Sequence, residues 1–139
     1  MQIKPLTEDV SVGSQVRPGD IAGLAARGIR TIVCNRPDGE EWGQPTFAEI
    51  AQAASEAGIE AVQIPIYGGN LPPEAVAEFR KALDEKPGPV LAYCRSGMRS
   101  SALWALSQAR TRTVVDILAS TARAGYDLSG LAPRLSNPG

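Results

Sequence analysis

One stretch decides the fold of this chain: Val90-Leu91-Ala92-Tyr93-Cys94-Arg95-Ser96-Gly97-Met98-Arg99-Ser100-Ser101. An apolar run ends at Cys94, a short polar loop follows up to Arg99, and the residues after it have helical spacing. The order of strand, loop and helix is typical of a parallel α/β sheet, in which ligands bind beyond the carboxyl ends of the strands. The stretch therefore predicts both a fold class and the position of a site.

The rest of the chain repeats this alternation. Short apolar runs with β propensity cover residues 10–12, 29–34, 60–66 and 89–94. Helical segments are predicted from about 18 to 28, 46 to 58, 73 to 86, 99 to 110 and 114 to 124, with a short turn and a loose end in the tail from 127 to 139. We therefore expect one α/β domain over residues 1–139, with a central, mostly parallel sheet of four to five strands flanked by helices.

Composition excludes several kinds of chemistry and partner. The 139 residues contain no histidine, which excludes Ser-His-Asp and Cys-His catalysis and histidine-ligated zinc. The cysteines, Cys34 and Cys94, have unlike surroundings and form no Cys-x-x-Cys motif, so we predict neither a metal nor a cofactor. A net charge of −1 argues against nucleic acid and against an anionic membrane as partners. With no long apolar segment, we expect a cytoplasmic protein; its oligomeric state is not predicted.

Cys94 is the predicted nucleophile. The backbone amides from Arg95 to Arg99 and the start of the following helix are expected to surround its sulfur and stabilise a thiolate without a histidine. Gly97 permits the positive φ that such a turn requires, and Arg99 supplies a fork of donors for a tetrahedral anion. A buried packing cysteine is the alternative, but it would not need the arginines, glycine and serines that follow Cys94.

The chain also resembles known families. The motif Cys-Arg-Ser-Gly-Met-Arg-Ser at positions 94–100 resembles the active loop of rhodanese-type sulfurtransferases and is related to the longer loop of cysteine-dependent phosphatases. Segments 35–40, 92–97, 103–106 and 124–128 resemble the phosphatase-like domain of bacterial beta-lactamase hydrolase-like proteins, and the match covers nearly the whole chain. The resemblance implies a fold of the dual-specificity phosphatase type. That family occurs alone or fused to a persulfide dioxygenase, which the resemblance implies as a partner.

Carried over residue by residue, the resemblance assigns roles to the loop. It makes Cys94 the nucleophile and Arg99 the anion clamp. The substrate-binding residues of the predicted site are Arg95, Ser96, Gly97, Met98, Ser100 and Arg36. Ser96, Gly97 and Met98 contribute backbone amides in this assignment, and Ser100 places a hydroxyl beside the thiolate.

The length of the loop favours sulfur transfer. Phosphatases of this type have His-Cys and then five residues before the arginine, whereas this chain has Tyr93 before Cys94 and four residues before Arg99. We therefore expect a sulfurtransferase in which Cys94 takes a sulfane sulfur from thiosulfate or a small persulfide and passes it to a thiol acceptor such as glutathione. A phosphatase with a phosphocysteine intermediate is the alternative. A module that binds an anion or senses oxidants without catalysis is the third possibility.

Three further features have two interpretations each. The segment Arg36-Pro37-Asp38-Gly39 is either a tight turn or a wall of the site, in which Arg36 supports substrate and Asp38 orients Arg99 or donates a proton. Cys34 either packs in the core or resolves an oxidised Cys94 as a disulfide. The segment from Tyr67 to Asn70 is either a plain loop or a rim of the pocket.

Overall fold

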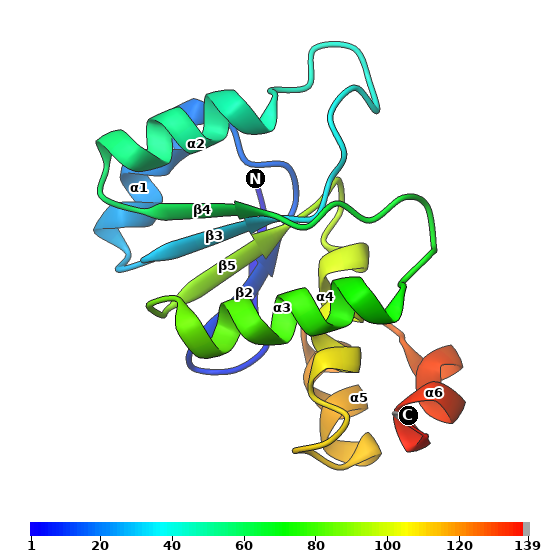
Figure 1. Cartoon of the computed structure of the whole chain (residues 1–139). Helices are drawn as coiled ribbons and strands as arrows, with labels where there is room; N and C mark the ends of the chain where they lie inside the picture. Colours follow the sequence, from blue (N-terminus) through cyan, green and yellow to red (C-terminus); the bar gives the residue numbers. More distant parts are fainter. Residues whose placement is uncertain (138–139) are drawn as a thin grey trace.

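The computed structural model describes residues 1–137 and contains a five-stranded sheet in the order β1-β2-β5-β3-β4 (Figure 1). The strands are β1 (Ile3–Pro5), β2 (Val10–Gly13), β3 (Thr31–Cys34), β4 (Glu60–Gln63) and β5 (Val90–Tyr93). β1 is antiparallel to β2, and the other neighbouring strands are parallel. The expected α/β fold with a mostly parallel sheet of four to five strands is confirmed.

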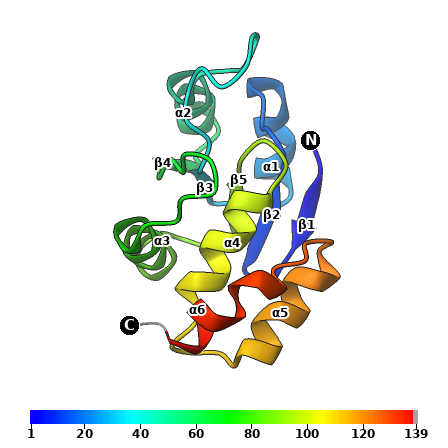
Figure 2. The same ribbon diagram turned by 90° about the vertical axis from the view of Figure 1, so that its right-hand side faces the viewer.

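Helices cover both faces of this sheet (Figures 1 and 2). They are α1 (Ile21–Ala26), α2 (Phe47–Glu56), α3 (Pro73–Glu85), α4 (Met98–Ser107), α5 (Val114–Arg123) and α6 (Ala132–Ser136), with short 3₁₀ helices before α1 and α6. Helices α1 and α2 lie on one side, and α3, α4 and α5 lie on the other. No helix within residues 1–137 is long and apolar enough to span a membrane.

The two faces of the sheet belong to different hydrophobic cores, because side chains alternate along a strand. In β5, Leu91 and Tyr93 join the core beneath α1 and α2. Val90 and Ala92 join the larger core beneath α3, α4 and α5. Since β5 is the middle strand of the sheet and is buried on both faces, its carboxyl end is held in place from both sides.

Local sequence explains where the elements begin and end. The predicted capping box is present at α2, where Thr46 accepts the Glu49 N–H and Glu49 accepts the Thr46 N–H. The strand predicted over residues 60–66 ends at Gln63, although the N–H groups of Ile64 and Ile66 still donate to the carbonyls of Cys34 and Asn35. The apolar runs do not predict β1, whose side chains are partly buried at the edge of the sheet. Of the predicted tail, residues 138–139 lie outside the described part.

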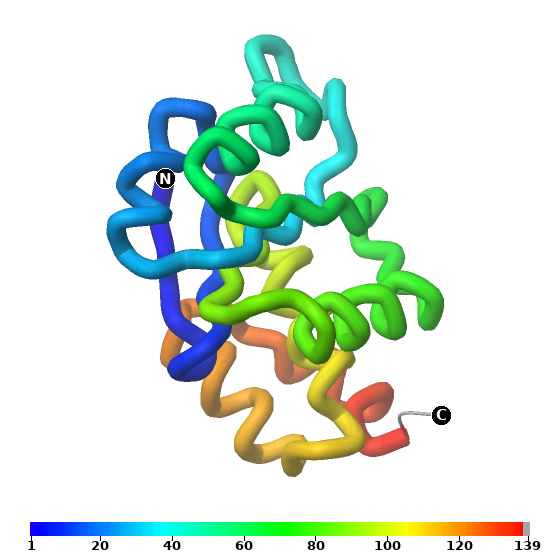
Figure 3. The backbone as a smooth tube through the Cα atoms, turned by 60° about the vertical axis from the view of Figure 1, so that its left-hand side comes forward, coloured from blue at the N-terminus to red at the C-terminus, as the bar shows by residue number. Residues whose placement is uncertain are grey.

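Three loops meet beyond the carboxyl ends of the parallel strands. We call them the β3–α2 loop (residues 35–46), the β4–α3 loop (residues 64–72) and the β5–α4 loop (residues 94–97). Strands β3 and β5 are paired so that Cys34 lies opposite Tyr93, which brings the first residues of two of these loops together. The β3–α2 loop projects beyond the sheet, as the cyan segment of Figures 1 and 3 shows.

Candidate active site

Cys94 lies directly after β5 and is buried, with 1% of its surface exposed. Its Sγ accepts a hydrogen bond from the N–H of Gly97 at 3.1 Å. Its own N–H donates to the carbonyl of Gly13 in β2 at 3.3 Å, which extends the pairing of the two strands into the loop. The sulfur therefore lies at the N-terminus of α4, where free amides and the helix dipole favour a negative charge.

Gly97 gives the β5–α4 loop its shape. Its φ of 94° is in the left-handed region, and it is the N-cap residue of α4. A Cβ at this position would collide with the hydroxyl of Tyr126, which follows α5. That hydroxyl donates to the carbonyl of Ser96 at 2.8 Å. A residue far along the chain thus fixes the turn, and only glycine fits there.

Tyr126 remains a hydrogen-bond donor because its phenol resists ionisation. Burial raises the pKa of Tyr126, and the neighbouring Cys94 raises it further, since a negative charge there disfavours a phenolate. The protonated hydroxyl can therefore keep donating to the Ser96 carbonyl.

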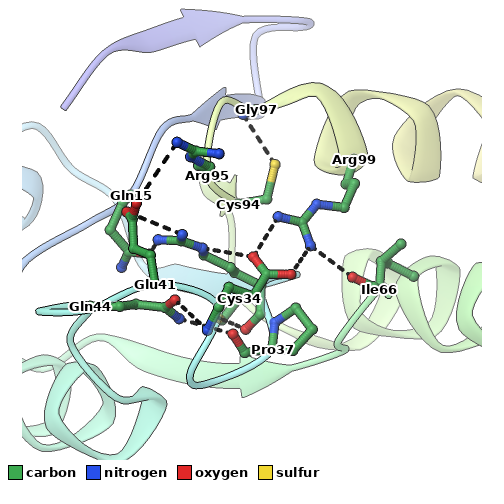
Figure 4. A network of polar contacts seen from close by, with 12 residues as sticks. Gln15, Cys34, Pro37, Glu41, Gln44, Ile66, Cys94, Arg95, Gly97 and Arg99 are labelled. Atoms are coloured by element: carbon green, nitrogen blue, oxygen red, sulfur yellow. Dashed lines mark hydrogen bonds and ion pairs between the residues drawn. The ribbon is translucent and has the colours of Figure 1, made fainter. Parts of the chain in front are cut away.

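Arg99 reaches back from the first turn of α4 to the loops beside it (Figure 4). Its Nη1 donates to Oε2 of Glu40 at 2.7 Å and to the carbonyl of Ile66 at 2.9 Å, and its Nη2 donates to Oε1 of Glu40 at 2.8 Å. The pKa of Arg99 is raised, first by its hydrogen bonds to Glu40 and in smaller part by Cys94 beside it. The guanidinium is therefore permanently charged and held in one orientation.

The contacts of Arg99 with Glu40 and Ile66 leave one edge of the guanidinium on the side of Cys94. Glu40 and Ile66 together use both N–H groups of Nη1 and one N–H of Nη2. The N–H groups of Nε and the remaining one of Nη2 point the same way, as a fork suited to two oxygens of a phosphate. Figure 4 shows this guanidinium beside the Cys94 sulfur. Nucleophile and anion clamp are thus adjacent.

Glu40 is held from the other side by Arg36, whose side chain is only 1% exposed. Nε of Arg36 donates to Oε1 of Glu40 at 2.8 Å, and its Nη1 donates to Oε1 of Gln15 at 2.9 Å. Glu41 pairs with Nη2 of Arg36 at 3.2 Å and with Arg95 at 3.8 Å. The hydrogen bonds from Arg99, followed by those from Arg36, lower the pKa of Glu40 to about 2. The carboxylate is thus an anion at neutral pH.

Several predicted residues have partners other than those expected. Asp38 does not contact Arg99; its Oδ1 accepts the N–H of Phe47 at 2.8 Å, at the start of α2. Arg36 is buried and holds Glu40 rather than facing substrate. The hydroxyl of Ser100 donates to Oδ1 of Asn35 at 2.8 Å, because both side chains are enclosed between α4 and β3.

The predicted loop amides also differ among themselves. The Gly97 N–H is directed to the sulfur, whereas the N–H of Met98 donates to Oγ of Ser96 at 3.3 Å. Arg95 is exposed and pairs with Glu41 across the entrance. Of these two amides, the one of Gly97 therefore contacts the sulfur directly.

Sequence reasoning missed Glu40, Asn35 and Tyr126. Glu40 and Asn35 stand at the ends of the segment 35–40, and the spacing of Arg36 and Glu40 at i and i+4 was an available signal for an ion pair. Tyr126 lies in the segment 124–128, about thirty residues from the loop it supports. Nothing in the local pattern around position 126 points to Ser96.

Cys34 is buried and its thiol donates to the carbonyl of Arg36 at 3.3 Å. Burial raises the pKa of Cys34, and the hydrogen bond with Tyr93 offsets this only in part. Both cysteines are free thiols. A disulfide between them stays a prediction.

The fold and the cysteine loop define a domain of the cysteine-phosphatase type with dual-specificity architecture. Kinase associated phosphatase, solved with its catalytic-site cysteine replaced by serine, aligns with a TM-score of 0.72 over 91% of this chain and 83% of its own, at 17% sequence identity. At that identity the likeness shows the fold. It confirms the expected architecture.

The chain belongs to the family described as beta-lactamase hydrolase-like protein, phosphatase-like domain, which matches residues 2–111. A beta-lactamase hydrolase-like protein from Agrobacterium fabrum is 33% identical over 109 residues, which make up 78% of this chain and 25% of that protein. The chain thus spans about a quarter of the length of such relatives. A candidate phosphatase from Neisseria meningitidis Z2491 has a crystal structure that aligns with a TM-score of 0.87 and 36% identity, over 100% of this chain and 99% of its own.

The prediction of a sulfurtransferase is wrong. The matching family is phosphatase-like, and the similar solved structures are phosphatases or candidate phosphatases. The length of the Cys-x4-Arg loop misled the prediction, because backbone amides at a helix N-terminus and an arginine can hold a phosphate as well as a sulfonate. The alternative, a cysteine-dependent phosphatase, fits these relatives better.

Proposed function

We propose that this protein is a cysteine-dependent phosphatase that removes a phosphoryl group through a phosphocysteine on Cys94. The observation that carries this proposal is the fork of Arg99, whose Nε and Nη2 edge is left unused by Glu40 and lies beside the sulfur. A phosphoryl group bound to that fork would have its phosphorus next to Cys94. The 36% identity with the candidate phosphatase from Neisseria meningitidis, over the whole chain, supports the same chemistry.

The reaction needs two displacements at phosphorus. Sγ of Cys94 attacks the phosphorus, an S–P bond forms, and the bond to the leaving oxygen breaks. Water then attacks the phosphocysteine, the S–P bond breaks, its electron pair returns to Sγ, and a proton of the water passes to solvent. Arg99 and the Gly97 N–H stabilise the charge on the transferring group in both steps, because they are fixed before substrate binds.

A reducing compartment would keep Cys94 as the free thiol that this mechanism requires, so we place the protein in the cytoplasm.

The test is phosphate release from p-nitrophenyl phosphate, combined with intact-mass analysis of protein quenched with acid during turnover. We expect turnover by the unmodified chain, a transient gain of one phosphoryl group, and loss of both in Cys94→Ser. Arg99→Lys should raise KM and lower kcat, because an ammonium cannot bind two phosphate oxygens in one plane.

Cys34→Ala is the matched control, since it removes the other cysteine and should leave the phosphocysteine in place. Phosphate release that persists in Cys94→Ser, or no release by the unmodified chain, would overturn the proposal. The second result would leave the anion-binding module of the sequence analysis as the better description.

A further inference from the structure

The carboxylates nearest the site all come from the β3–α2 loop, and each is held by donors. Oδ1 of Asp38 accepts the Phe47 N–H at the start of α2. Glu40 is bound through both oxygens to Arg99, and Glu41 pairs with Arg95. These groups act as acceptors that shape the loop.

The lowered pKa of Glu40 shows that this carboxylate stays ionised at neutral pH. Its pKa of about 2 follows from the two arginines that hold it. A group that delivers a proton to a leaving oxygen at neutral pH needs a pKa near that pH. Glu40 therefore positions Arg99 and does not supply a proton.

The β4–α3 loop, on the other side of Arg99, presents groups of a different kind. It carries Tyr67-Gly68-Gly69-Asn70, directly after the Ile66 carbonyl that Arg99 binds. Tyr67 is 66% exposed, and its carbonyl closes a turn with the N–H of Asn70. The side chains of this stretch are a phenol and an amide, and residues 67–70 contain no carboxylate.

From this arrangement we infer that the substrates of the proposed phosphatase are phosphoryl compounds whose leaving group departs as a weakly basic anion. Esters of acidic phenols and phosphoanhydrides have such leaving groups. The inference rests on the proposed function and names its substrate class.

In the first step the Sγ electron pair forms the S–P bond. The P–O bond then breaks, and the leaving oxygen keeps the electron pair as a phenolate or a phosphate, without receiving a proton. In the second step water takes the place of the sulfur, as described above. A general acid contributes about 10²- to 10⁴-fold to such a step where one is used. Basic alkoxides should therefore be poor leaving groups for this enzyme.

The test measures kcat/KM for a series of substituted phenyl phosphates whose phenols differ in acidity, together with benzyl phosphate. Benzyl phosphate has nearly the shape of phenyl phosphate, but its leaving group is a strongly basic alkoxide. We expect kcat/KM to fall steadily as the phenol becomes less acidic and benzyl phosphate to react at least about 100-fold more slowly than the nitrophenyl ester. Inorganic pyrophosphate is the phosphoanhydride substrate in this test. Comparing its kcat/KM with those of the phenyl phosphates shows which of the two substrate classes, anhydrides or aryl esters, the enzyme prefers.

Two variants decide whether a carboxylate donates a proton. Asp38→Asn and Glu41→Gln keep hydrogen-bonding capacity but cannot deliver a proton, and we expect the dependence on the leaving group to be the same in both as in the unmodified chain. A flat dependence, with benzyl phosphate as good a substrate as phenyl phosphate, would overturn the inference. A flat dependence that becomes steep in either variant would also overturn it and would identify the acid.

These outcomes are distinct from failure of the proposed function. If even the most activated aryl phosphate is not hydrolysed, or is hydrolysed equally well by Cys94→Ser, the phosphatase proposal itself fails. Hydrolysis that depends on Cys94 but not on the leaving group refutes only the substrate class.

Discussion

Glu40 binds the guanidinium of Arg99 through both carboxylate oxygens, at 2.7 and 2.8 Å, across 59 positions of sequence. This contact joins the β3–α2 loop to the first turn of α4. The buried side chain of Arg36 donates to the same carboxylate, so two arginines hold Glu40 in place. The orientation of the Arg99 guanidinium therefore depends on Glu40, a residue of a different loop from Cys94.

Replacing Glu40 with glutamine should lower activity by releasing Arg99. Hydrogen bonds between charged groups contribute about 1.5–3 kcal/mol each, and each 1.36 kcal/mol corresponds to tenfold in rate. We expect kcat/KM of Glu40→Gln to fall by roughly ten- to a hundredfold. The inhibition constant of inorganic phosphate should rise in parallel, because the fork that binds it is no longer held in place.

Glu78→Gln is the control for this prediction, since Glu78 is an exposed carboxylate on α3 and is not the carboxylate that Arg99 binds. Its kcat/KM and its inhibition by phosphate should match those of the unmodified chain. A Glu40→Gln protein that binds phosphate normally would show that Arg99 needs no support from the β3–α2 loop.

The same contact predicts how stability depends on pH. The pKa of Glu40 is lowered from 4.5 to about 2 in the folded protein, first by the hydrogen bonds from Arg99. A lowered folded-state pKa stabilises the protein at pH values above the unfolded pKa, and that stabilisation is lost as pH falls from 4.5 toward 2. Above this window the contribution of Glu40 is constant.

Urea unfolding measures this effect if Glu40→Gln is compared with the unmodified chain at each pH. The difference in free energy of unfolding between the two should be constant above about pH 5 and should shrink steadily below it. Subtraction removes the contribution of the other carboxylates, which titrate in the same range. A difference that stays constant into the acid range would mean that Glu40 is not ion-paired in solution.

The fold and the position of Cys94 were predictable from local patterns. The apolar run that ends at Cys94 is the middle strand of the sheet, and the capping box at Thr46 marks the start of α2 as expected. Short-range periodicity and caps determine such elements, and so does the position of a loop after a parallel strand.

The contacts that tune the site were not predictable, because they join segments distant in sequence. Asp38 was the expected partner of Arg99, yet Glu40 two residues later makes the contact. The path of the β3–α2 loop decides between them, and that path depends on the buried side chain of Arg36. The contribution of Tyr126 likewise requires α5 to be packed beside α4.

The turn at Gly97 should not tolerate a side chain. Gly97→Ala combines a φ of 94° with a Cβ that collides with Tyr126, and a non-glycine residue in such a conformation costs about 1–3 kcal/mol. We expect lower stability in chemical denaturation and a severe loss of turnover, because the N–H that contacts Cys94 would move.

A double-mutant cycle separates the collision from the backbone strain. Tyr126→Phe alone removes the hydrogen bond to Ser96 and should cost about 1 kcal/mol. In the Gly97→Ala/Tyr126→Phe protein the colliding hydroxyl is gone, so the combined loss should be smaller than the sum of the two single losses. Gly23→Ala is the control, since Gly23 lies in α1 with open space around it and should be slightly stabilised. Additive losses would mean that Tyr126 does not constrain the turn.

Cys34 should be unreactive in the folded protein despite being a free thiol on the strand next to Cys94. Burial raises its pKa above the usual 9.0, so its thiolate, the reactive form, is scarce at neutral pH. The thiol is also bonded to the Arg36 carbonyl at 3.3 Å, inside the core beneath α1 and α2. In Cys94→Ser, labelling with iodoacetamide followed by intact mass should show no alkylation at neutral pH until urea unfolds the chain. At each pH below the raised pKa, the folded protein should react more slowly than the unfolded one. The Cys34→Ala protein serves as the counterpart that carries only Cys94. Rapid labelling of Cys34 in the folded Cys94→Ser protein would show that the β3–α2 loop opens in solution, and it would make the predicted disulfide with Cys94 accessible.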